Sequence, residues 1–83
     1  MDDRAKGKFG RKIKARRIEL GLKREQLAVK MGLTRDQIAR IEQGKQIPPI
    51  DIGLKLGTVL GINIPRVLAQ LDSEEDHAVN VGP

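Results

Sequence analysis

Apolar side chains recur along the chain at intervals of three or four residues, the spacing that places them on one face of a helix. In the first such segment the inward positions are Phe9, Ile13, Arg17 and Leu20. Gly21 then ends the segment as a left-handed cap would, and Leu22 returns to the core. We therefore predict a first helix that begins at Phe9 and ends before Gly21.

Glycine and proline divide the rest of the chain into further short helices. Thr34 stands where an N-cap side chain accepts an N–H group, and Pro65 stands in the first turn of the last segment. Pro48 and Pro49 cannot both lie inside a helix, so they belong to a loop. The later helices are predicted at about 24–31, 35–42, 51–60 and 65–71. Because no period-two alternation of useful length is present, the predicted fold class is all-α, a five-helix bundle without a sheet.

The third predicted helix has an apolar side and a polar side. Its inward positions are Ile38 and Ile41. The residues that this leaves largely exposed are Arg35, Asp36, Gln37, Ala39 and Arg40. A polar helix face of this kind is either a solvated surface or a surface that binds a ligand.

Charge is distributed unevenly along the chain. All 16 Lys and Arg residues and seven of the 11 Asp and Glu residues lie in 1–71, which gives this part a net charge of +9. The other four acids give 72–83 a net charge of −4. A basic body suits a polyanion, either nucleic acid or an anionic membrane surface. We predict a flexible basic arm over 1–8, a domain over 9–71 and an acidic disordered tail over 72–83.

The residue inventory speaks against catalysis and against a metal site. The chain has no Cys, and its single Ser (Ser73) and single His (His77) both lie in the acidic tail. A disulfide framework and a thiolate zinc site are therefore excluded, and no Ser–His–Asp set can be built. We expect no enzyme activity, no cofactor and no metal. No apolar run approaches the roughly 20 residues of a membrane span, so we expect a cytoplasmic protein without a membrane partner.

Two short helices joined by a tight Gly-containing turn form a helix-turn-helix arrangement, and they lie in the stretch RRIELGLKREQLAVKMGLTRDQIARIEQGKQIPP. This stretch resembles the phage repressor and Cro-like (xenobiotic-response-element) family of helix-turn-helix DNA-binding domains. The matching positions are Arg17, Gly21-Leu22, Leu27-Ala28, Gly32, Thr34, Ile38, Ile41-Glu42, Gly44-Lys45, Pro48, Leu56 and Leu60-Gly61. The resemblance covers about 9–71 and implies a lambda-repressor-like bundle whose third helix enters the DNA major groove.

The resemblance assigns roles to the exposed polar residues. Positions that read DNA bases in the family correspond to Arg35, Asp36, Gln37 and Arg40. Arginine offers a bidentate fork to guanine O6 and N7, and aspartate accepts a hydrogen bond from cytosine N4. Asp36 also lies where an acid favours a helix N-terminus, so both roles stay open for it.

The candidate phosphate-contacting residues are Lys23, Arg24, Thr34, Gln43 and Lys45, and all of these except Lys23 match phosphate-contacting positions of the family. Lys23 and Arg24 stand at the start of the second helix, where the helix dipole and free N–H groups favour an anion. Arg17 and Glu42 match a family pair that forms a partly buried salt bridge between the first and third helices. Such a partner would explain Arg17 on an apolar stripe, because an unpaired buried charge costs several kcal/mol.

The region around the fourth and fifth helices matches the dimer contacts of phage repressors. The candidate interface residues are Pro49, Ile50, Ile64 and Val67. Gly53 and Gly57 depart from the family pattern, which has a bulky apolar residue and an alanine there. Each glycine costs roughly 0.5–1 kcal/mol in a helix interior, so the fourth helix is either marginally stable or offers a flat strip to another helix.

These observations predict a sequence-specific DNA-binding transcriptional regulator, a repressor that reads a palindromic operator in double-stranded DNA as a homodimer. Two alternatives stay open. One is the antitoxin of a toxin–antitoxin pair, which would bind a toxin as well as its own promoter. The other is a protein–protein adaptor that keeps the fold without reading DNA. The basic arm would either wrap around the duplex or make no fixed contact.

Overall fold

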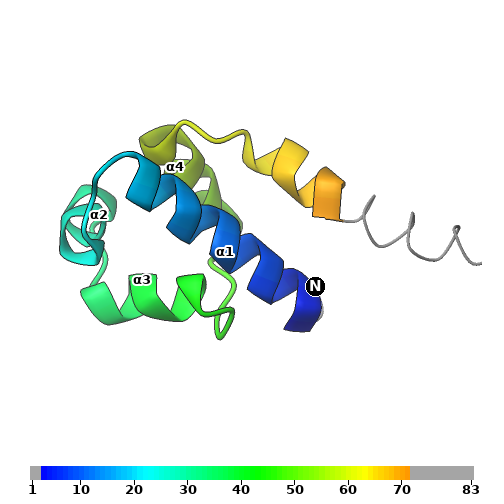
Figure 1. Cartoon of the computed structure of the whole chain (residues 1–83), viewed down its shortest axis with the longest axis horizontal. Coiled ribbons are helices and arrows are strands. Elements are labelled where there is room, and N and C mark those ends of the chain that lie inside the picture. Colours follow the sequence, from blue (N-terminus) through cyan, green and yellow to red (C-terminus); the bar gives the residue numbers. More distant parts are fainter. Residues whose placement is uncertain (1–2, 72–83) are drawn as a thin grey trace, which may run out of the picture.

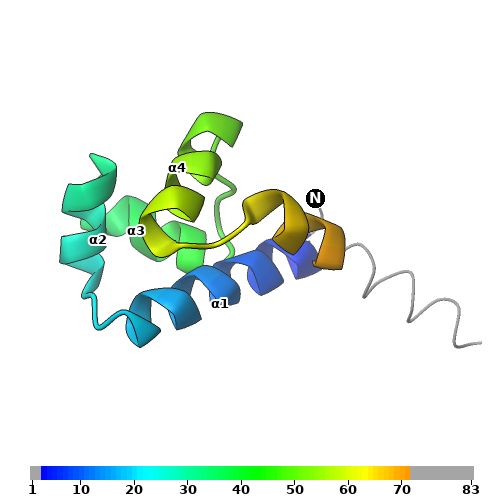
Figure 2. The same cartoon turned by 90° about the horizontal axis from the view of Figure 1, so that it is seen from above.

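A computed structural model describes residues 3–71 of the chain. These residues form five helices and no strand, which confirms the predicted all-α fold. The helices are α1 (Asp3–Glu19), α2 (Arg24–Met31), α3 (Arg35–Glu42), α4 (Ile50–Leu60) and a last helix, Ile64–Leu71. α1 runs along the domain with α3 beside it, and the last helix lies next to the N-terminal half of α1 (Figures 1 and 2).

The core lies between α1, α2, α3, α4 and the last helix. Its largest fully buried side chains are Ile13, Leu27, Ile38, Leu56, Leu60 and Leu71. Two predictions about burial are wrong. Leu20 is 42% exposed because α1 ends at Glu19 and leaves Leu20 in the turn. Ala39 is buried as well, so the buried side of α3 is wider than Ile38 and Ile41 alone.

The N-terminal segment is helical, so the prediction of a flexible arm is wrong for residues 3–8. Ala5 is buried and precedes Phe9 by four residues, which extends the apolar stripe of α1 by one turn. The loop after α3 packs against this turn, and a Cβ added to Gly44 would lie 2.9 Å from Gly7 Cα. Residues 1–2 and the predicted acidic tail at 72–83 lie outside the described residues.

Local hydrogen bonds fix the start of the second and third helices. Thr34 Oγ1 accepts a hydrogen bond from the Gln37 N–H at 3.1 Å, and Gln37 Oε1 accepts one from the Thr34 N–H at 2.8 Å. This reciprocal capping box confirms the predicted N-cap. At the start of α2, Gln26 Oε1 accepts from the Lys23 N–H at 2.8 Å. The lysine ammonium cannot complete a capping box there because it has no lone pair.

Two glycines four residues apart on α4 have different surroundings. A Cβ added to Gly57 would lie 2.6 Å from the Ile62 carbonyl oxygen and 2.8 Å from Ile64 Cγ1. At Gly53 the nearest atom would be Pro48 Cγ at 4.0 Å. The chain that folds back after α4 therefore leaves no room for a side chain at Gly57, whereas the neighbours of Gly53 leave room for one.

We expect alanine at these two positions to change stability in opposite directions. Gly53→Ala should raise the free energy of unfolding by about 0.5–1 kcal/mol, because alanine loses less conformational entropy in a helix. Gly57→Ala should lower it by about 1–3 kcal/mol, because Ile62 and Ile64 must move. Urea unfolding followed by circular dichroism measures both changes, and shifts of the same sign would contradict this contrast.

Candidate nucleic-acid interface

The helix pair α2–α3 presents one polar surface because its apolar residues are turned into the core. The buried anchors are Leu27, Ala28 and Met31 from α2 and Ile38, Ala39 and Ile41 from α3. Between the helices, the Leu33 N–H donates to the Ala28 carbonyl oxygen at 2.9 Å, which closes the turn. With these contacts fixed, the exposed residues of α3 are Arg35, Asp36 and Arg40.

Arg35 is held by a residue of the neighbouring helix. Arg35 Nε donates to Glu25 Oε1 at 2.6 Å, and both side chains are more than half exposed (53% and 57%). A hydrogen bond from its own backbone N–H and then the one from Arg35 hold the pKa of Glu25 below its usual value. The contact uses Arg35 Nε, so the donors on the two Nη atoms stay available to another acceptor.

The other predicted base-reading residues have different surroundings. Arg40 is exposed and, within the described part of the chain, forms no side-chain hydrogen bond or ion pair. Asp36 is exposed in the first turn of α3, where an acid favours the helix N-terminus. Gln37 is half-buried, and its side-chain oxygen is engaged with the Thr34 N–H. Arg40 is thus the arginine of α3 with the whole guanidinium available.

A buried ionic cluster joins α1, α2 and α3. Arg17 Nε lies 2.6 Å from Glu42 Oε2, and Arg17 Nη2 donates to Glu42 Oε1 at 3.1 Å. Arg17 Nη1 also donates to the Leu22 carbonyl oxygen at 2.8 Å. The Glu42 side chain is fully buried and that of Arg17 is 9% exposed. The structure therefore contains the salt bridge that the resemblance implies, in a bidentate form.

Arg24 is a third member of this cluster, which the sequence reasoning missed. Its Nε lies 3.0 Å from Glu42 Oε1, and its side chain is 22% exposed. The signal in the sequence was an arginine at a position where the family usually has a glutamine. Glu42 thus holds one edge of the Arg24 guanidinium at the N-terminus of α2 and leaves the Nη donors available.

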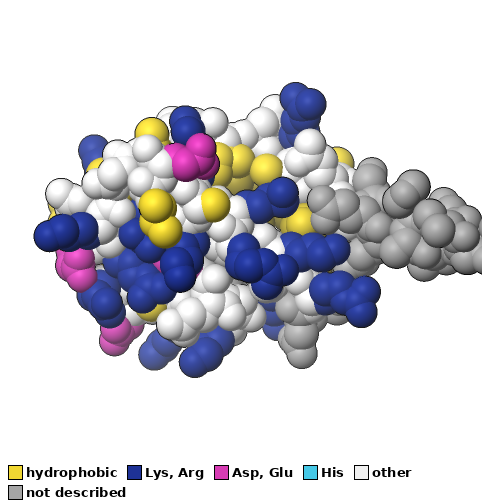
Figure 3. Space-filling view, viewed as in Figure 1, with side chains coloured by type: hydrophobic (Ala, Val, Ile, Leu, Met, Phe, Trp, Pro, Cys, Tyr) yellow, Lys and Arg dark blue, Asp and Glu magenta, His cyan; other side chains and the backbone are white. Residues whose placement is uncertain are grey.

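The remaining predicted phosphate-binding residues lie at the edges of α2 and α3. Lys23 precedes α2 and is exposed, whereas Gln43 and Lys45 follow α3 and are exposed. Thr34 is exposed as well, and its hydroxyl oxygen already accepts the capping hydrogen bond. Figure 3 shows Lys and Arg side chains gathered over this end of the domain and continuing along α1.

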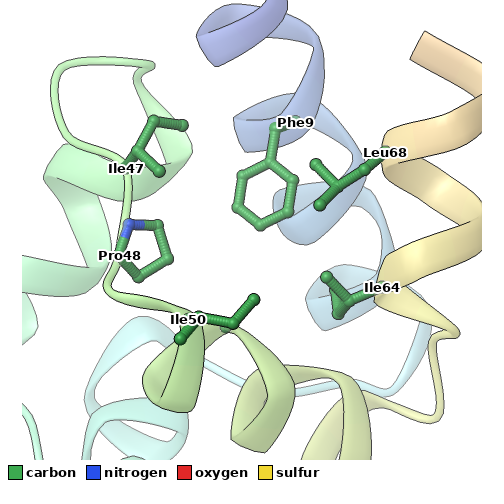
Figure 4. A pocket seen from close by; sticks show the side chains of 7 residues that line it. Phe9, Ile47, Pro48, Ile50, Ile64 and Leu68 are labelled. Atoms are coloured by element: carbon green, nitrogen blue, oxygen red, sulfur yellow. The ribbon is translucent and has the colours of Figure 1, made fainter. Parts of the chain in front are cut away.

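A separate apolar surface lies at the start of α4 and contains a cavity of about 160 Å³. The cavity is lined by Phe9, Ile47, Pro48, Ile50, Gly53, Ile64 and Leu68 (Figure 4). Of the predicted dimer residues, Pro49 and Ile50 are exposed and Val67 is half-buried. Ile64 is only 4% exposed and forms part of the cavity wall, so it does not present an outward surface. Leu54, one turn beyond Ile50, is 48% exposed and was not predicted.

Residues 4–71 contain no cluster of three or more His, Cys, Asp or Glu side chains that could hold a metal ion. In the same range, no single helix is both long enough and apolar enough to cross a membrane. Only α4 taken together with Ile64–Leu71, across a bend of 108°, has the required length and composition.

Comparisons with known proteins agree with this geometry. A family model described as helix-turn-helix matches residues 13–67. An uncharacterized HTH-type transcriptional regulator of Methanocaldococcus jannaschii, MJ0272, is 33% identical over 63 residues, which cover 76% of this chain and 96% of that protein.

Two solved structures have the same fold. The restriction-modification controller protein C.AhdI from Aeromonas hydrophila has a TM-score of 0.70 and 35% identity, covering 80% of this chain and 94% of its own. The clp gene regulator ClgR from Corynebacterium glutamicum also has a TM-score of 0.70, at 17% identity, over 93% of this chain and 89% of its own. This chain therefore belongs to the Cro/C1-type (xenobiotic-response-element) family of helix-turn-helix proteins, a family of DNA-binding transcriptional regulators.

Proposed function

We propose that this protein is a sequence-specific transcriptional repressor that binds a palindromic operator as a homodimer, with α3 in the major groove. The observation that supports this best is the outward face of α3, where Arg35, Asp36 and Arg40 are exposed. An eight-residue helix is about 12 Å long, and the major groove is about 12 Å wide. Basic residues at both edges of this face suit the two phosphate backbones of the groove.

The proposed roles follow from the chemistry of each side chain. Arg40 reads guanine through O6 and N7, and Asp36 accepts from cytosine N4. Arg35 reads a base through its Nη atoms while Glu25 holds its Nε, and Gln37 contributes through its amide nitrogen. The phosphate contacts are assigned to Lys23, Arg24, Thr34, Gln43 and Lys45. These contacts fix the register of the protein on the duplex, whereas the α3 contacts specify the sequence.

The proposed dimer forms through the apolar surface at the start of α4. Ile50 and Leu54 are 69% and 48% exposed and lie one turn apart on α4. Ile50 also borders the apolar cavity, and apolar surface of this kind is typical of protein contacts. Pro49 is exposed next to Ile50 and Val67 is half-buried, whereas Ile64 supports this surface from the cavity wall without facing the partner. A two-fold dimer on a palindrome places the two recognition helices about 34–36 Å apart, one turn of duplex.

The test is selection from a randomised pool of duplex DNA at about 0.15 M salt, followed by sequencing and by sedimentation of the free protein. Enrichment of a palindrome with half-sites one turn apart is expected. An unenriched pool, obtained with protein that circular dichroism shows to be folded, would contradict the proposal and favour the adaptor alternative.

The antitoxin alternative depends on the same apolar surface. If Ile50 and Leu54 bind a toxin and not a second copy of this chain, the protein without its toxin is a monomer that still selects a DNA sequence. Sedimentation therefore separates the two functions, because a monomer that enriches a single half-site favours the antitoxin.

Replacing Arg40 with alanine is expected to weaken binding to the selected operator by about 1–3 kcal/mol, or about 5- to 150-fold, if Arg40 forms one bidentate pair with a guanine. Fluorescence anisotropy with a labelled duplex measures the affinity. Lys55→Ala is the matched control, because Lys55 is an exposed cation on α4, outside the α2–α3 pair. Equally weakened binding in the two variants would show that Arg40 acts only through net charge.

A further inference from the structure

α1 carries exposed cations that the helix-turn-helix site does not use. Arg4, Arg11 and Lys14 are all exposed. At 3.6 residues per turn, these three residues and Gly7 lie within an arc of about 80° on one side of the helix. They therefore form one stripe, which we name the α1 stripe: Arg4, Arg11 and Lys14.

The α1 stripe meets the loop that follows the recognition helix. A Cβ added to Gly44 would lie 2.9 Å from Gly7 Cα and 3.0 Å from Gly7 N, so the loop backbone rests on this side of α1. The guanidinium of Arg11 lies over Gly7, with Nη1 3.4 Å from the point where a Gly7 Cβ would be. Lys45, the next residue of the loop, is exposed. The loop that carries Lys45 thus lies against the stripe, and Figure 3 shows Lys and Arg side chains near the α2–α3 pair and along α1.

The charges of the α1 stripe are not neutralised within the described residues. None of the ion pairs found in residues 4–71 involves Arg4, Arg11 or Lys14. Glu19, the acid of the last turn of α1, lies beside Arg16 instead. Because the stripe is on a helix and not on a flexible arm, binding an anion there requires little ordering of the backbone.

We propose that the α1 stripe is a second phosphate-binding surface, which holds the stretch of DNA backbone adjacent to the phosphate that Lys45 contacts. This inference rests on the proposed function. Arg4 and Lys14 are ten residues apart, about 15 Å along the helix, and phosphates on one strand recur at about 3.4 Å along the duplex axis. A stripe of this length reaches more than one phosphate of a strand. Its contribution is independent of base sequence and depends on salt.

The test compares two triple variants that each remove three positive charges. One removes the stripe through Arg4→Gln, Arg11→Gln and Lys14→Gln. The control removes exposed cations on other elements through Lys30→Gln, Lys55→Gln and Arg66→Gln. The affinity of each for the selected operator duplex is measured between 50 and 200 mM salt. We expect the stripe variant to bind about ten- to a hundredfold more weakly, with a slope of log affinity against log salt reduced by about 2–3, because each phosphate contact contributes about 0.9. The control should stay within about threefold of the parent protein.

A phosphate-ethylation interference experiment on the same duplex gives the position of the contacts. Some phosphates should weaken binding of the parent protein when ethylated but have no effect on binding of the stripe variant. These phosphates should directly adjoin the ones that behave in this way for a Lys45→Gln variant. A further variant, Arg4→Lys with Arg11→Lys, should keep the parent slope, because a phosphate contact needs only a positive charge there.

Several results would overturn this inference. They are an unchanged salt slope, an equally weakened control, or interference changes away from those of Lys45. A stripe variant that no longer binds anionic phospholipid vesicles but binds DNA like the parent protein would overturn it as well. That result would assign the stripe to a membrane surface. A failure of the proposed function looks different, because the parent protein itself would then not distinguish the operator from a scrambled duplex.

Discussion

Replacing Glu42 with alanine is expected to lower the free energy of unfolding by about 3–5 kcal/mol. The Glu42 carboxylate is fully buried and is shared by Arg17 and Arg24, with nitrogen–oxygen distances of 2.6 and 3.0 Å. Its removal leaves two guanidinium groups without a counter-charge, one of them almost wholly buried. Since small domains are stable by about 5–15 kcal/mol in total, the thermal midpoint followed by circular dichroism should fall steeply.

Two comparisons separate this effect from a general loss of charge. Glu19→Ala removes a carboxylate that is 65% exposed and 4.0 Å from Arg16, and it should cost less than about 1 kcal/mol. Adding Arg17→Met to Glu42→Ala should recover part of the stability, because the buried cation that lacked a partner is then gone. Equal destabilisation by Glu19→Ala and Glu42→Ala, or no recovery in the double variant, would show that the ionic cluster does not determine stability.

Replacing Gly10 with alanine should also be strongly destabilising. A Cβ at Gly10 would collide with the Ile41 carbonyl oxygen and would lie 2.5 Å from the Glu42 carbonyl oxygen. Both are backbone atoms at the end of α3 and cannot rotate away, so α1 and α3 must separate. We expect the free energy of unfolding to fall by about 3 kcal/mol, the upper end of the usual range for overpacking.

The matched control for this variant is Gly7→Ala, one turn earlier on the same helix. The nearest atom to a Cβ there is Arg11 Nη1 at 3.4 Å, the end of a flexible side chain. Gly7→Ala should therefore raise stability by about 0.5–1 kcal/mol. Urea unfolding measures both variants, and a Gly10→Ala protein as stable as the Gly7→Ala protein would mean that α1 and α3 are not in close backbone contact.

Elements whose ends are fixed by neighbouring residues could be predicted from the sequence. The limits of α2 and α3 agree with the prediction because Thr34 and the glycines act on the chain close to them. The first turns of α1 could not be predicted, because their apolar side consists of Ala5 alone before Phe9. Their burial also depends on the contact between Gly7 and Gly44, which are far apart in sequence.

The same distinction applies to the candidate site. A charge on an apolar stripe requires a partner, so the sequence indicated a buried ion pair for Arg17. The contacts of Arg24 with Glu42 and of Arg35 with Glu25 depend on how α2 sits against α3. That arrangement is set by core packing, which a periodic pattern does not specify. The burial of Ile64 was missed for the same reason, because its neighbours come from α1 and α4.

The two sides of α3 have different tasks, and this division bears on how the protein can diversify. Ile38, Ile41 and Glu42 are buried, whereas Arg35, Asp36 and Arg40 take no part in any buried contact of the helix. Substitution of these three exposed residues changes the chemical groups on the surface of α3 and leaves the packing of the core intact. A lineage of such proteins could therefore acquire new binding preferences by a few substitutions, without first having to regain stability.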